Sequence, residues 1–227
     1  MKILAVADEE APYLYDYYNP RRTEGVDFII GCGDLKASYL EFLTTVVNKP
    51  VFYVCGNHDT GYEKKAPEGC ICIDGTVAEY KGLRIAGLGG SRKYKPNAPY
   101  MYTEKEMMRR IRALKPYIKA FGGVDILVTH APAEGYGDME DLPHRGFECF
   151  NSFLDEYKPE YMLHGHVHKQ YGDFVRQREH ESGTTIINCY ESAVIEIDND
   201  KIGTVSEKTK RKVRFLRLLS RKRNEGL

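Results

Sequence analysis

The sequence contains no apolar run long enough to cross a membrane or to act as a secretion signal. The first apolar run, residues 3–7, stops at Asp8 after five residues. A membrane-spanning helix needs about 20 apolar residues, and a signal peptide has an apolar region of about 7–15 residues. We therefore expect a cytoplasmic protein without a transmembrane segment.

No Cys-x-x-Cys motif is present, and the six cysteines are scattered along the chain. Cys70 and Cys72 form a Cys-x-Cys pair, which is not the spacing of a zinc knuckle. A chain of 227 residues can bury a sizeable core without disulfides. Scattered thiols in such a chain favour an intracellular location, and we expect them to be buried and inert. They are Cys32, Cys55, Cys70, Cys72, Cys149 and Cys189.

The chain has no net charge, with 33 basic and 33 acidic residues, but the charge is unevenly distributed. Residues 206–227 hold nine Lys or Arg against two Glu, so this tail carries +7 and the remainder −7. Apolar residues among these cations favour a helix that packs on the body. A nucleic-acid or anionic-membrane contact is the alternative, although one aromatic residue, Phe215, gives little support for base stacking. We assign residues 1–200 to the main domain and 201–227 to a basic tail or helix.

Short apolar runs bounded by Gly, Pro or charged residues predict buried strands. They cover residues 2–7, 27–30, 50–55, 124–128 and 161–163. Between them, apolar residues at helical spacing predict helices at 39–47 and 147–157. Thr103-x-x-Glu106 is a capping box that opens another helix, which we expect to be interrupted at Pro116.

The segment 70–88 predicts antiparallel strands, because its short apolar runs are separated by Asp74-Gly75 and Lys81-Gly82 and Asp-Gly favours a hairpin. Two β-branched runs, 184–188 and 193–197, are expected to close the sheet. Strands that alternate with helices, followed by antiparallel pieces, predict an α/β fold of two packed mixed β-sheets flanked by helices.

Five of the predicted strands end in side chains that can bind a metal ion. Because the carboxyl ends of strands meet at one edge of a sheet, we expect residues far apart in the sequence to converge there. The residues are Asp8 with Glu10, Asp34, Asn57 with His58, His130, and His166 with His168.

This ordered set resembles the calcineurin-like metallophosphoesterase superfamily, whose pattern is Asp-x-His, Gly-Asp, Gly-Asn-His-Asp or -Glu, a His, and Gly-His-x-His. Here the pattern reads Asp8-x-Glu10, Gly33-Asp34, Gly56-Asn57-His58-Asp59, Thr129-His130 and Gly165-His166-Val167-His168. The resemblance spans residues 8–168, and the strands predicted up to residue 197 fit the same fold. It implies a four-layer α/β/β/α sandwich and a dinuclear, metal-dependent phosphoesterase.

By this resemblance the site would hold two divalent ions bridged by Asp34, and a bridging hydroxide would attack phosphorus. Such a pair, roughly 3.5–4 Å apart, clamps the attacking and leaving oxygens. The other ligands would be Asp8, Glu10 and His168 for the first ion, and Asn57, His130 and His166 for the second. His58 would donate a proton to the leaving oxygen or stabilise charge, and Asp59 would fix the His58 imidazole and hold its pKa up.

One position departs from the family pattern, because Glu10 stands where the family has a histidine. A carboxylate there adds a negative charge, which weakens the hold on an anionic phosphate and favours harder ions over zinc. We expect manganese or iron, with zinc or magnesium as alternatives. In the competing interpretation Glu10 points away, and Glu9 or water takes its place.

Nearby cations could offset that charge by binding a substrate phosphate. His144 and Arg145 are the candidates, with loop hydrogen bonding or helix capping as the alternative. Arg92 and Lys93 are weaker candidates, since most loop cations are only solvated. We expect His164 to hydrogen-bond behind the metal ligands and His180 to face solvent.

We therefore expect a phosphoesterase that acts on a phosphomonoester or phosphodiester, with a small molecule or nucleotide as substrate. A catalytically weak or inactive metal-binding scaffold that binds other proteins is the alternative, although His58 argues for catalysis. A third hypothesis, a hydrolase directed to nucleic acid by the basic tail, has weaker support. The sequence indicates no oligomeric state.

Overall fold

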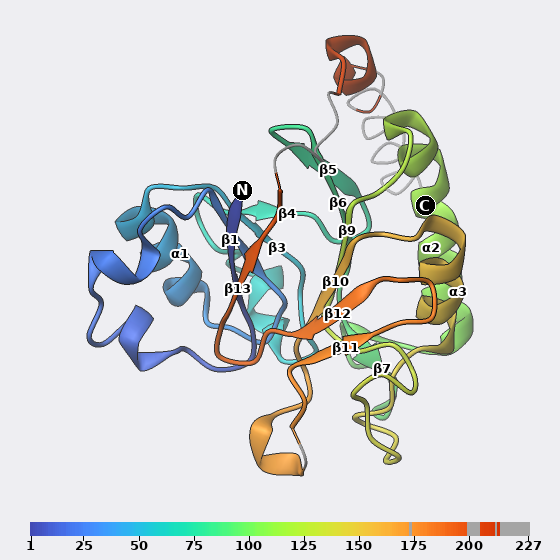
Figure 1. The fold of residues 1–227 in the computed structure, drawn as a ribbon. Coiled ribbons are helices and arrows are strands. Elements are labelled where there is room, and N and C mark those ends of the chain that lie inside the picture. Colours follow the sequence, from blue (N-terminus) through green and yellow to red (C-terminus); the bar gives the residue numbers. More distant parts are fainter. Residues whose placement is uncertain (173, 199–204, 212, 214–227) are drawn as a thin grey trace.

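Two β-sheets pack face to face at the centre of the molecule, with helices outside them (Figure 1). The computed structural model describes residues 1–172, 174–198, 205–211 and 213. In spatial order the first sheet contains β13 (Ala193–Glu196), β1 (Lys2–Val6), β2 (Phe28–Gly31), β3 (Val51–Tyr53) and β4 (Ile71–Cys72). The second contains β11 (Gln177–Glu179), β12 (Thr185–Asn188), β10 (Tyr161–His164), β9 (Ile126–Thr129), β6 (Leu83–Leu88) and β5 (Val77–Tyr80).

The helices and the remaining strands connect these two sheets. The α-helices are α1 (Ala37–Val47), α2 (Glu104–Phe121) and α3 (Glu148–Tyr157). The 3-10 helices are η1 (Pro12–Leu14), η2 (Pro20–Thr23), η3 (Asp59–Glu63) and η4 (Lys169–Tyr171). A short parallel pair consists of β7 (Ser91–Arg92) and β8 (Met101–Tyr102).

Alternation of side chains along β1 shows how the layers are built. Ile3 and Ala5 belong to the buried cluster between the sheets, whereas Leu4 and Val6 belong to the cluster under α1. Successive side chains of a strand point to opposite faces, so one buried strand serves two interfaces. Each fully buried aliphatic side chain of this size contributes about 1.5–3 kcal/mol.

The second sheet is covered on its outer face by α2 and α3. Ile111 and Leu114 of α2 and Phe150 of α3 pack in one cluster with Leu127 of β9. Apolar residues three or four positions apart place this face of each helix on the sheet. The layers therefore run helix, sheet, sheet, helix, and the predicted α/β fold of two packed mixed sheets is confirmed.

Helix α2 is continuous, so the interruption expected at Pro116 is wrong. Proline removes one backbone hydrogen bond inside a helix. Leu114, Tyr117 and Ile118 on either side of it are buried in the cluster beneath α2, and this packing holds the helix together through the proline. The expected capping box is present, since Thr103 and Glu106 each bind the backbone N–H of the other.

The hairpin expected at Asp74-Gly75 is also wrong. Strand β4 pairs in parallel with β3 in the first sheet, while β5 lies in the second sheet and pairs antiparallel with β6. The chain thus crosses between sheets at Asp74, and the hairpin turn lies at Lys81-Gly82, where both φ angles are positive. The late strands β12 and β13 likewise lie in different sheets.

Of the basic tail, the structure describes residues 205–211 and 213. Val213 is buried in the cluster around α2 and α3, and Lys210 forms an ion pair with Glu79 at 3.0 Å. The other apolar residues of the tail, Phe215, Leu216, Leu218 and Leu219, lie outside the described residues.

Two of the cysteines depart from the expected burial, because Cys70 is half-buried and Cys72 is exposed, whereas the other four are buried. Both lie at or beside β4, the edge strand of the first sheet, which has a neighbour on one side only. Among the described residues, no helix is long and apolar enough to span a bilayer.

Replacing Thr103 by alanine tests the capping box. Loss of the hydroxyl leaves the N–H of Glu106 without its cap, so the free energy of unfolding should fall by about 1 kcal/mol. Thr45→Ala is the control, because that exposed hydroxyl only bonds back to the carbonyl of Glu41 within α1. Urea denaturation measures both, and equal values for the two variants would contradict the assignment.

Candidate metal centre

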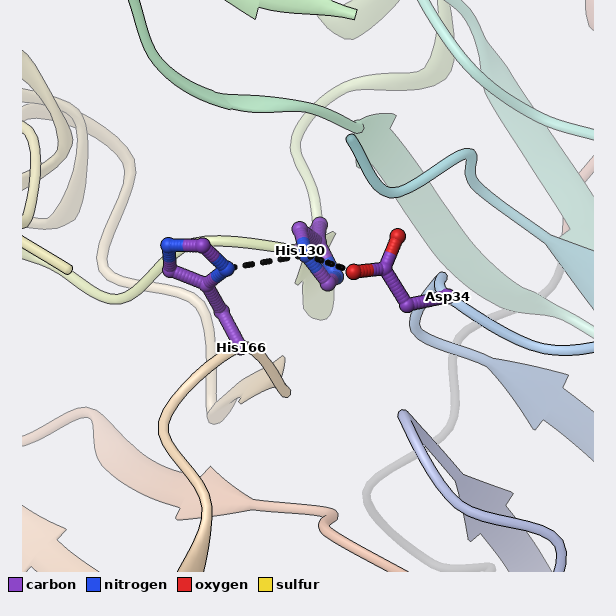
Figure 2. Close-up of side chains that lie close together, drawn as sticks. All are labelled: Asp34, His130 and His166. Carbon is purple, nitrogen blue, oxygen red and sulfur yellow. Dashed lines mark hydrogen bonds and ion pairs between the residues drawn. The ribbon is translucent and has the colours of Figure 1, made fainter. Parts of the chain in front are cut away.

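Residues from the two sheets meet where their strands end. Asp34 follows β2 of the first sheet, while His130 and His166 follow β9 and β10 of the second. A ligand atom of each lies within 4.8 Å of the others (Figure 2). His130 Nε2 is 3.3 Å from Asp34 Oδ2 and 3.1 Å from His166 Nδ1. The predicted convergence of these strand ends is therefore present in the fold.

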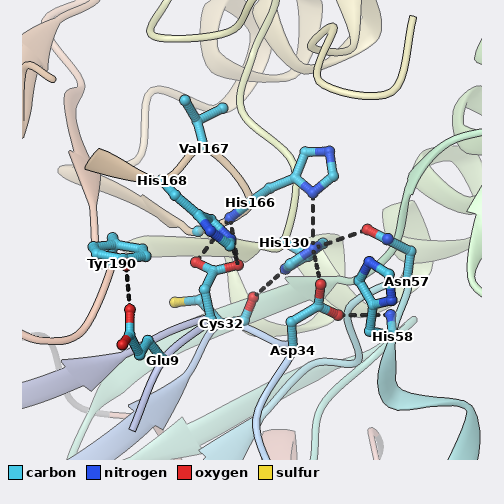
Figure 3. A network of polar contacts seen from close by, with 12 residues as sticks. Glu9, Cys32, Asp34, Asn57, His58, His130, His166, Val167, His168 and Tyr190 are labelled. Carbon is cyan, nitrogen blue, oxygen red and sulfur yellow. Dashed lines mark hydrogen bonds and ion pairs between the residues drawn. The ribbon is translucent and has the colours of Figure 1, made fainter. Parts of the chain in front are cut away.

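Asn57 adds a fourth donor to this group. Its Oδ1 atom lies 3.1 Å from His130 Nε2 (Figure 3). One carboxylate oxygen and two imidazole nitrogens thus lie within 4.8 Å of one another, and the amide oxygen of Asn57 lies against one of these nitrogens. Mixed oxygen and imidazole donors suit manganese, iron or zinc.

Both imidazoles are oriented as metal ligands require. His130 Nδ1 bonds to the carbonyl of Cys32 at 2.9 Å, and His166 Nε2 bonds to the carbonyl of Pro143 at 2.7 Å. A hydrogen bond from one ring nitrogen fixes the tautomer and leaves the other nitrogen to bind a metal. In each ring the other nitrogen, His130 Nε2 or His166 Nδ1, faces the cluster, so the donor set fits a cation.

Without an ion, Asp34 and His130 stabilise each other by charge. Burial favours the neutral carboxyl, but the His130 charge and hydrogen bonds lower the pKa of Asp34 to about 2. Burial alone would lower the pKa of His130, but Asp34 and Asp8 raise it to about 9. Burial and the His130 charge lower the pKa of His166 to about 3. A metal ion has to displace the His130 proton to bind this ring.

Asp8 and His168 form a second group beside the first. The Asp8 side chain is fully buried, and both its oxygens accept the backbone N–H of His166 at 2.9 Å. His168 Nε2 lies 3.6 Å from Asp8 Oδ1. Asp8, Asp34 and His168 line one hollow, so the two groups share a space.

Glu10 faces a different partner. Its carboxylate bonds to the backbone N–H of Lys36 at 3.3 Å and to Lys36 Nζ at 3.1 Å. Glu10 lines a second hollow together with Asp8 and Asp34, so it remains close to both groups of candidate ligands. The neighbouring Glu9 bonds instead to the hydroxyl of Tyr190 (Figure 3).

His58 and Asp59 hold the loop around Asp34. The backbone N–H of His58 donates to Asp34 Oδ1 at 2.7 Å, and the side chain of His58 is exposed on the rim of both hollows. The Asp59 carboxylate accepts the backbone N–H groups of Gly56 at 2.7 Å, Asp34 at 2.9 Å and Leu35 at 3.2 Å.

The predicted pairing of Asp59 with the His58 imidazole is therefore not found. The Asp59 carboxylate instead links the loop after β2 to the loop after β3. Three N–H donors converge on this carboxylate, and among the described residues it forms no hydrogen bond to the His58 ring. Burial raises the pKa of Asp59 to about 7, assisted by the Asp34 charge, despite the opposing effect of these backbone bonds.

Three of the site residues have left-handed backbones. The φ angles are 66° at Asp8, 56° at Asp34 and 71° at His166. Such angles are unfavourable for residues with a Cβ, by roughly 1–3 kcal/mol each. All three lie two or three residues after the end of a strand, so the sheets hold a conformation that turns these side chains into the site.

Two motif glycines allow carboxylates to approach the backbone. A Cβ at Gly56 would lie 2.0 Å from Asp34 Oδ1, and one at Gly165 would lie 2.4 Å from Asp8 Oδ2. No side chain fits at these distances. The glycines of the Gly-Asn-His-Asp and Gly-His-x-His motifs thus make room for the two aspartates.

A hollow of about 200 Å³ opens over the cluster. It is lined by Asp8, Asp34, Asn57, His58, Tyr94, Pro143, His144, His166, His168 and Tyr171. Tyr94 and Tyr171 are residues that sequence reasoning missed. Tyr94 accepts a hydrogen bond from Asn57 Nδ2 at 3.4 Å, and Tyr171 stacks on His168. Tyr171 follows the last motif by three residues, and that proximity was the available signal.

The candidate phosphate-binding cations occupy different places. His144 lines the hollow and bonds through Nδ1 to Asp141 at 2.7 Å. Arg145 is exposed, does not line the hollow and donates to the carbonyl of Glu140 at 2.8 Å. Arg92 pairs with Glu104, and Lys93 pairs with Glu106. Both of these cations therefore have protein partners at the start of α2.

The two remaining histidines are both buried. His164 bonds through Nδ1 to the carbonyl of Gly165, and burial lowers its pKa to about 4. His180 was expected to face solvent, but it is only 5% exposed. Its Nδ1 bonds to Ser182 and its ring packs against Tyr136 at 4.7 Å, which explains its burial.

Comparisons with known proteins find a family and a fold that match this chain. A family model described as calcineurin-like phosphoesterase matches residues 6–170. Two Caenorhabditis elegans proteins are similar: UPF0046 protein T07D4.2 is 36% identical over 69 residues, and UPF0046 protein K07C11.7 is 25% identical over 150 residues. The matches cover 30% and 58% of this chain but only 16% and 50% of those proteins. The crystal structure of TT1561 of Thermus thermophilus has a similar fold, with a TM-score of 0.58, 17% identity, and coverage of 84% of this chain and 89% of that one.

Substitution of Gly56 by alanine tests the close approach of Asp34. The new methyl group would collide with the Asp34 carboxylate, so manganese binding should be lost or weakened by more than about 100-fold. Gly61→Ala is the control in the adjacent helix η3, because a Cβ there meets nothing within 4 Å. Calorimetric titration with manganese compares the two, after thermal melting has shown that both are folded. Unchanged affinity in a folded Gly56→Ala variant would contradict the geometry.

Proposed function

Because the chain belongs to the calcineurin-like phosphoesterase family, we propose that it is a metal-dependent hydrolase of phosphate esters with two ion positions. The observation that carries the proposal is the convergence of ligand atoms of Asp34, His130 and His166 within 4.8 Å of one another, with Asn57 Oδ1 3.1 Å from His130 Nε2. Asp8 and His168 lie beside it in the same hollow. Asp34 lines both hollows together with Asp8, so we assign its carboxylate a bridging role.

Each position has its own donors in this proposal. Asn57, His130 and His166 would hold one ion, Asp8, His168 and Glu10 the other, and Asp34 both. Glu10 would have to leave Lys36 to reach its ion, which is feasible because Lys36 is largely exposed and an exposed ion pair is weak. Bound ions supply Lewis acidity and lower the pKa of a water molecule at the phosphorus. The oxygen of Glu10 favours manganese or iron in the position near Asp8.

His58 is the residue we assign to protonation of the leaving oxygen. Its imidazole reaches the rim of the hollow, and its backbone N–H is fixed on Asp34 at 2.7 Å. Asp59 holds this loop through the N–H groups of Gly56 and Asp34. In this proposal the His58 imidazole lies over the substrate as a proton donor and is not itself a metal ligand.

The substrate we propose is a small phosphomonoester or phosphodiester, nucleotides included. The hollow of about 200 Å³ suits a phosphate group with a short part of its ester. His144 lies on its wall and is assigned a contact with the phosphate. Arg145 would have to swing away from the carbonyl of Glu140 to contribute a second cation.

Metal analysis combined with turnover tests this function. The purified protein should bind two manganese or iron ions per chain and hydrolyse a phosphomonoester or phosphodiester of p-nitrophenol. His58→Ala should keep its metal and lose about 10²–10⁴-fold in kcat. Asn57→Ala should instead lose metal together with activity. A protein that binds two ions but turns over neither ester class with any metal would favour a scaffold over an enzyme.

The variant Glu10→His tests the effect of charge at the ion position near Asp8 and His168. A neutral imidazole replaces an anionic oxygen, so the ratio of zinc-supported to manganese-supported kcat/KM should rise by roughly tenfold, equivalent to about 1.4 kcal/mol. Glu24→His, on the exposed surface, is the control. An unchanged ratio in Glu10→His would show that this carboxylate is not a ligand.

A further inference from the structure

A third hollow, larger than the one over the cluster, opens beside the metal centre. It has a volume of about 470 Å³, within the usual range of small-molecule sites. Its wall includes the apolar side chains of Val167, Phe174 and Val175 together with Tyr171 and Arg178. Val175 and Tyr171 are 47% and 39% exposed, so apolar surface faces solvent around this space. An apolar or aromatic ligand would remove that surface from water.

This hollow adjoins the hollow over the cluster, and the two have lining residues in common. His168 and Tyr171 line both. The Tyr171 ring stacks on His168 with centroids 4.9 Å apart and planes at 14°, and its other ring contact is His144 at 4.7 Å. A molecule with its phosphate over the cluster would pass Tyr171, which is 39% exposed, to enter the larger space.

Arg178 gives the larger hollow a cation that lacks an anion. It lies on the edge strand β11, and its Nε is buried with no hydrogen-bond partner. Within the described part of the chain no ion pair of Arg178 is found, whereas Arg176, two residues earlier, binds the carbonyls of Asn188, Tyr190 and Ser192. A partly buried guanidinium without an acceptor is costly, and an oxyanion in the hollow would satisfy it.

The acidic residues of the same wall are engaged elsewhere. Asp138 accepts the backbone N–H groups of Gly135 at 2.8 Å and Gly146 at 2.9 Å, and Asp141 pairs with His144 at 2.7 Å. Glu140 is exposed at the rim. None of these carboxylates bonds to Arg178 in the described residues, so its charge remains available to a ligand.

We propose that this hollow is a subsite for the organic part of the ester, which carries an aromatic or apolar body and a second oxyanion bound by Arg178. The inference rests on the proposed function, because it places the phosphate over the cluster. A carboxylate and a second phosphate present the same oxygens to a guanidinium, and both belong to this class. Arg178 is then a specificity residue and takes no part in the chemical step.

Binding of phosphonates tests the subsite without turnover, since their carbon–phosphorus bond is not hydrolysed. The probes are phenylphosphonate, 3- and 4-carboxyphenylphosphonate and 1,4-phenylenediphosphonate, titrated calorimetrically into the manganese-loaded protein. The wild type should bind at least one of the probes with a second anion about tenfold more tightly than phenylphosphonate. Tighter binding of a carboxyphenylphosphonate would identify a carboxylate as the second anion, and tighter binding of the diphosphonate would identify a phosphate.

Substitutions of Arg178 separate this interaction from general charge effects. Arg178→Ala should abolish the preference and leave the affinity for phenylphosphonate unchanged, and Arg178→Lys should retain part of it. Arg178→Glu should reverse it in favour of 4-(aminomethyl)phenylphosphonate. Arg109→Ala removes the same charge from the exposed surface of α2 and should change nothing.

The outcomes distinguish the subsite from the proposed function. Equal affinities of the wild type for all probes, or a preference that persists in Arg178→Ala, would overturn the subsite while leaving the hydrolase proposal intact. Failure to hydrolyse any phosphate ester would overturn the hydrolase, yet the phosphonate titrations would still report on Arg178.

Discussion

The contact between the Asp34 carboxylate and the His130 imidazole joins the two sheets at the place where the site is built. Asp34 comes from the first sheet and His130 from the second, and 3.3 Å separates Nε2 from Oδ2. Each group perturbs the pKa of the other, so the pair is charged when no ion is bound. Everything else in the site depends on the two sheets being packed so that these residues face each other.

Packing of the sheets also supports an unfavourable local backbone. The buried layer between the sheets combines Ala7 and Cys32, from the turns that precede Asp8 and Asp34, with Val128 and Leu163 of the opposite sheet. It anchors the strands that lead, within two or three residues, to the positive φ angles. The strain at Asp8, Asp34 and His166 is therefore offset by hydrophobic contacts that are remote from the chemistry. A site that presents carboxylates and imidazoles to an ion requires this arrangement before any ion binds.

The sequence predicted the strand ends well because apolar runs that stop at Gly, Asp, Asn or His have one simple structural meaning. It could not show which sheet each strand joins, so the chain crossing at Asp74 and the separation of β12 from β13 appeared only in the fold. Side-chain partners were harder still. Asp59 binds backbone N–H groups, Glu10 pairs with Lys36, and the His180 ring packs against Tyr136. Each of these contacts depends on residues that are neighbours only in the folded chain, so a sequence motif does not show them.

The central claim is that Asp34 stands between two metal ions, one held by residues of each group. Anomalous diffraction from crystals of the manganese-loaded protein tests it directly. The account predicts two manganese peaks roughly 3.5–4 Å apart, with the Asp34 carboxylate in contact with both. A single peak, or a pair that Asp34 does not bridge, would contradict it.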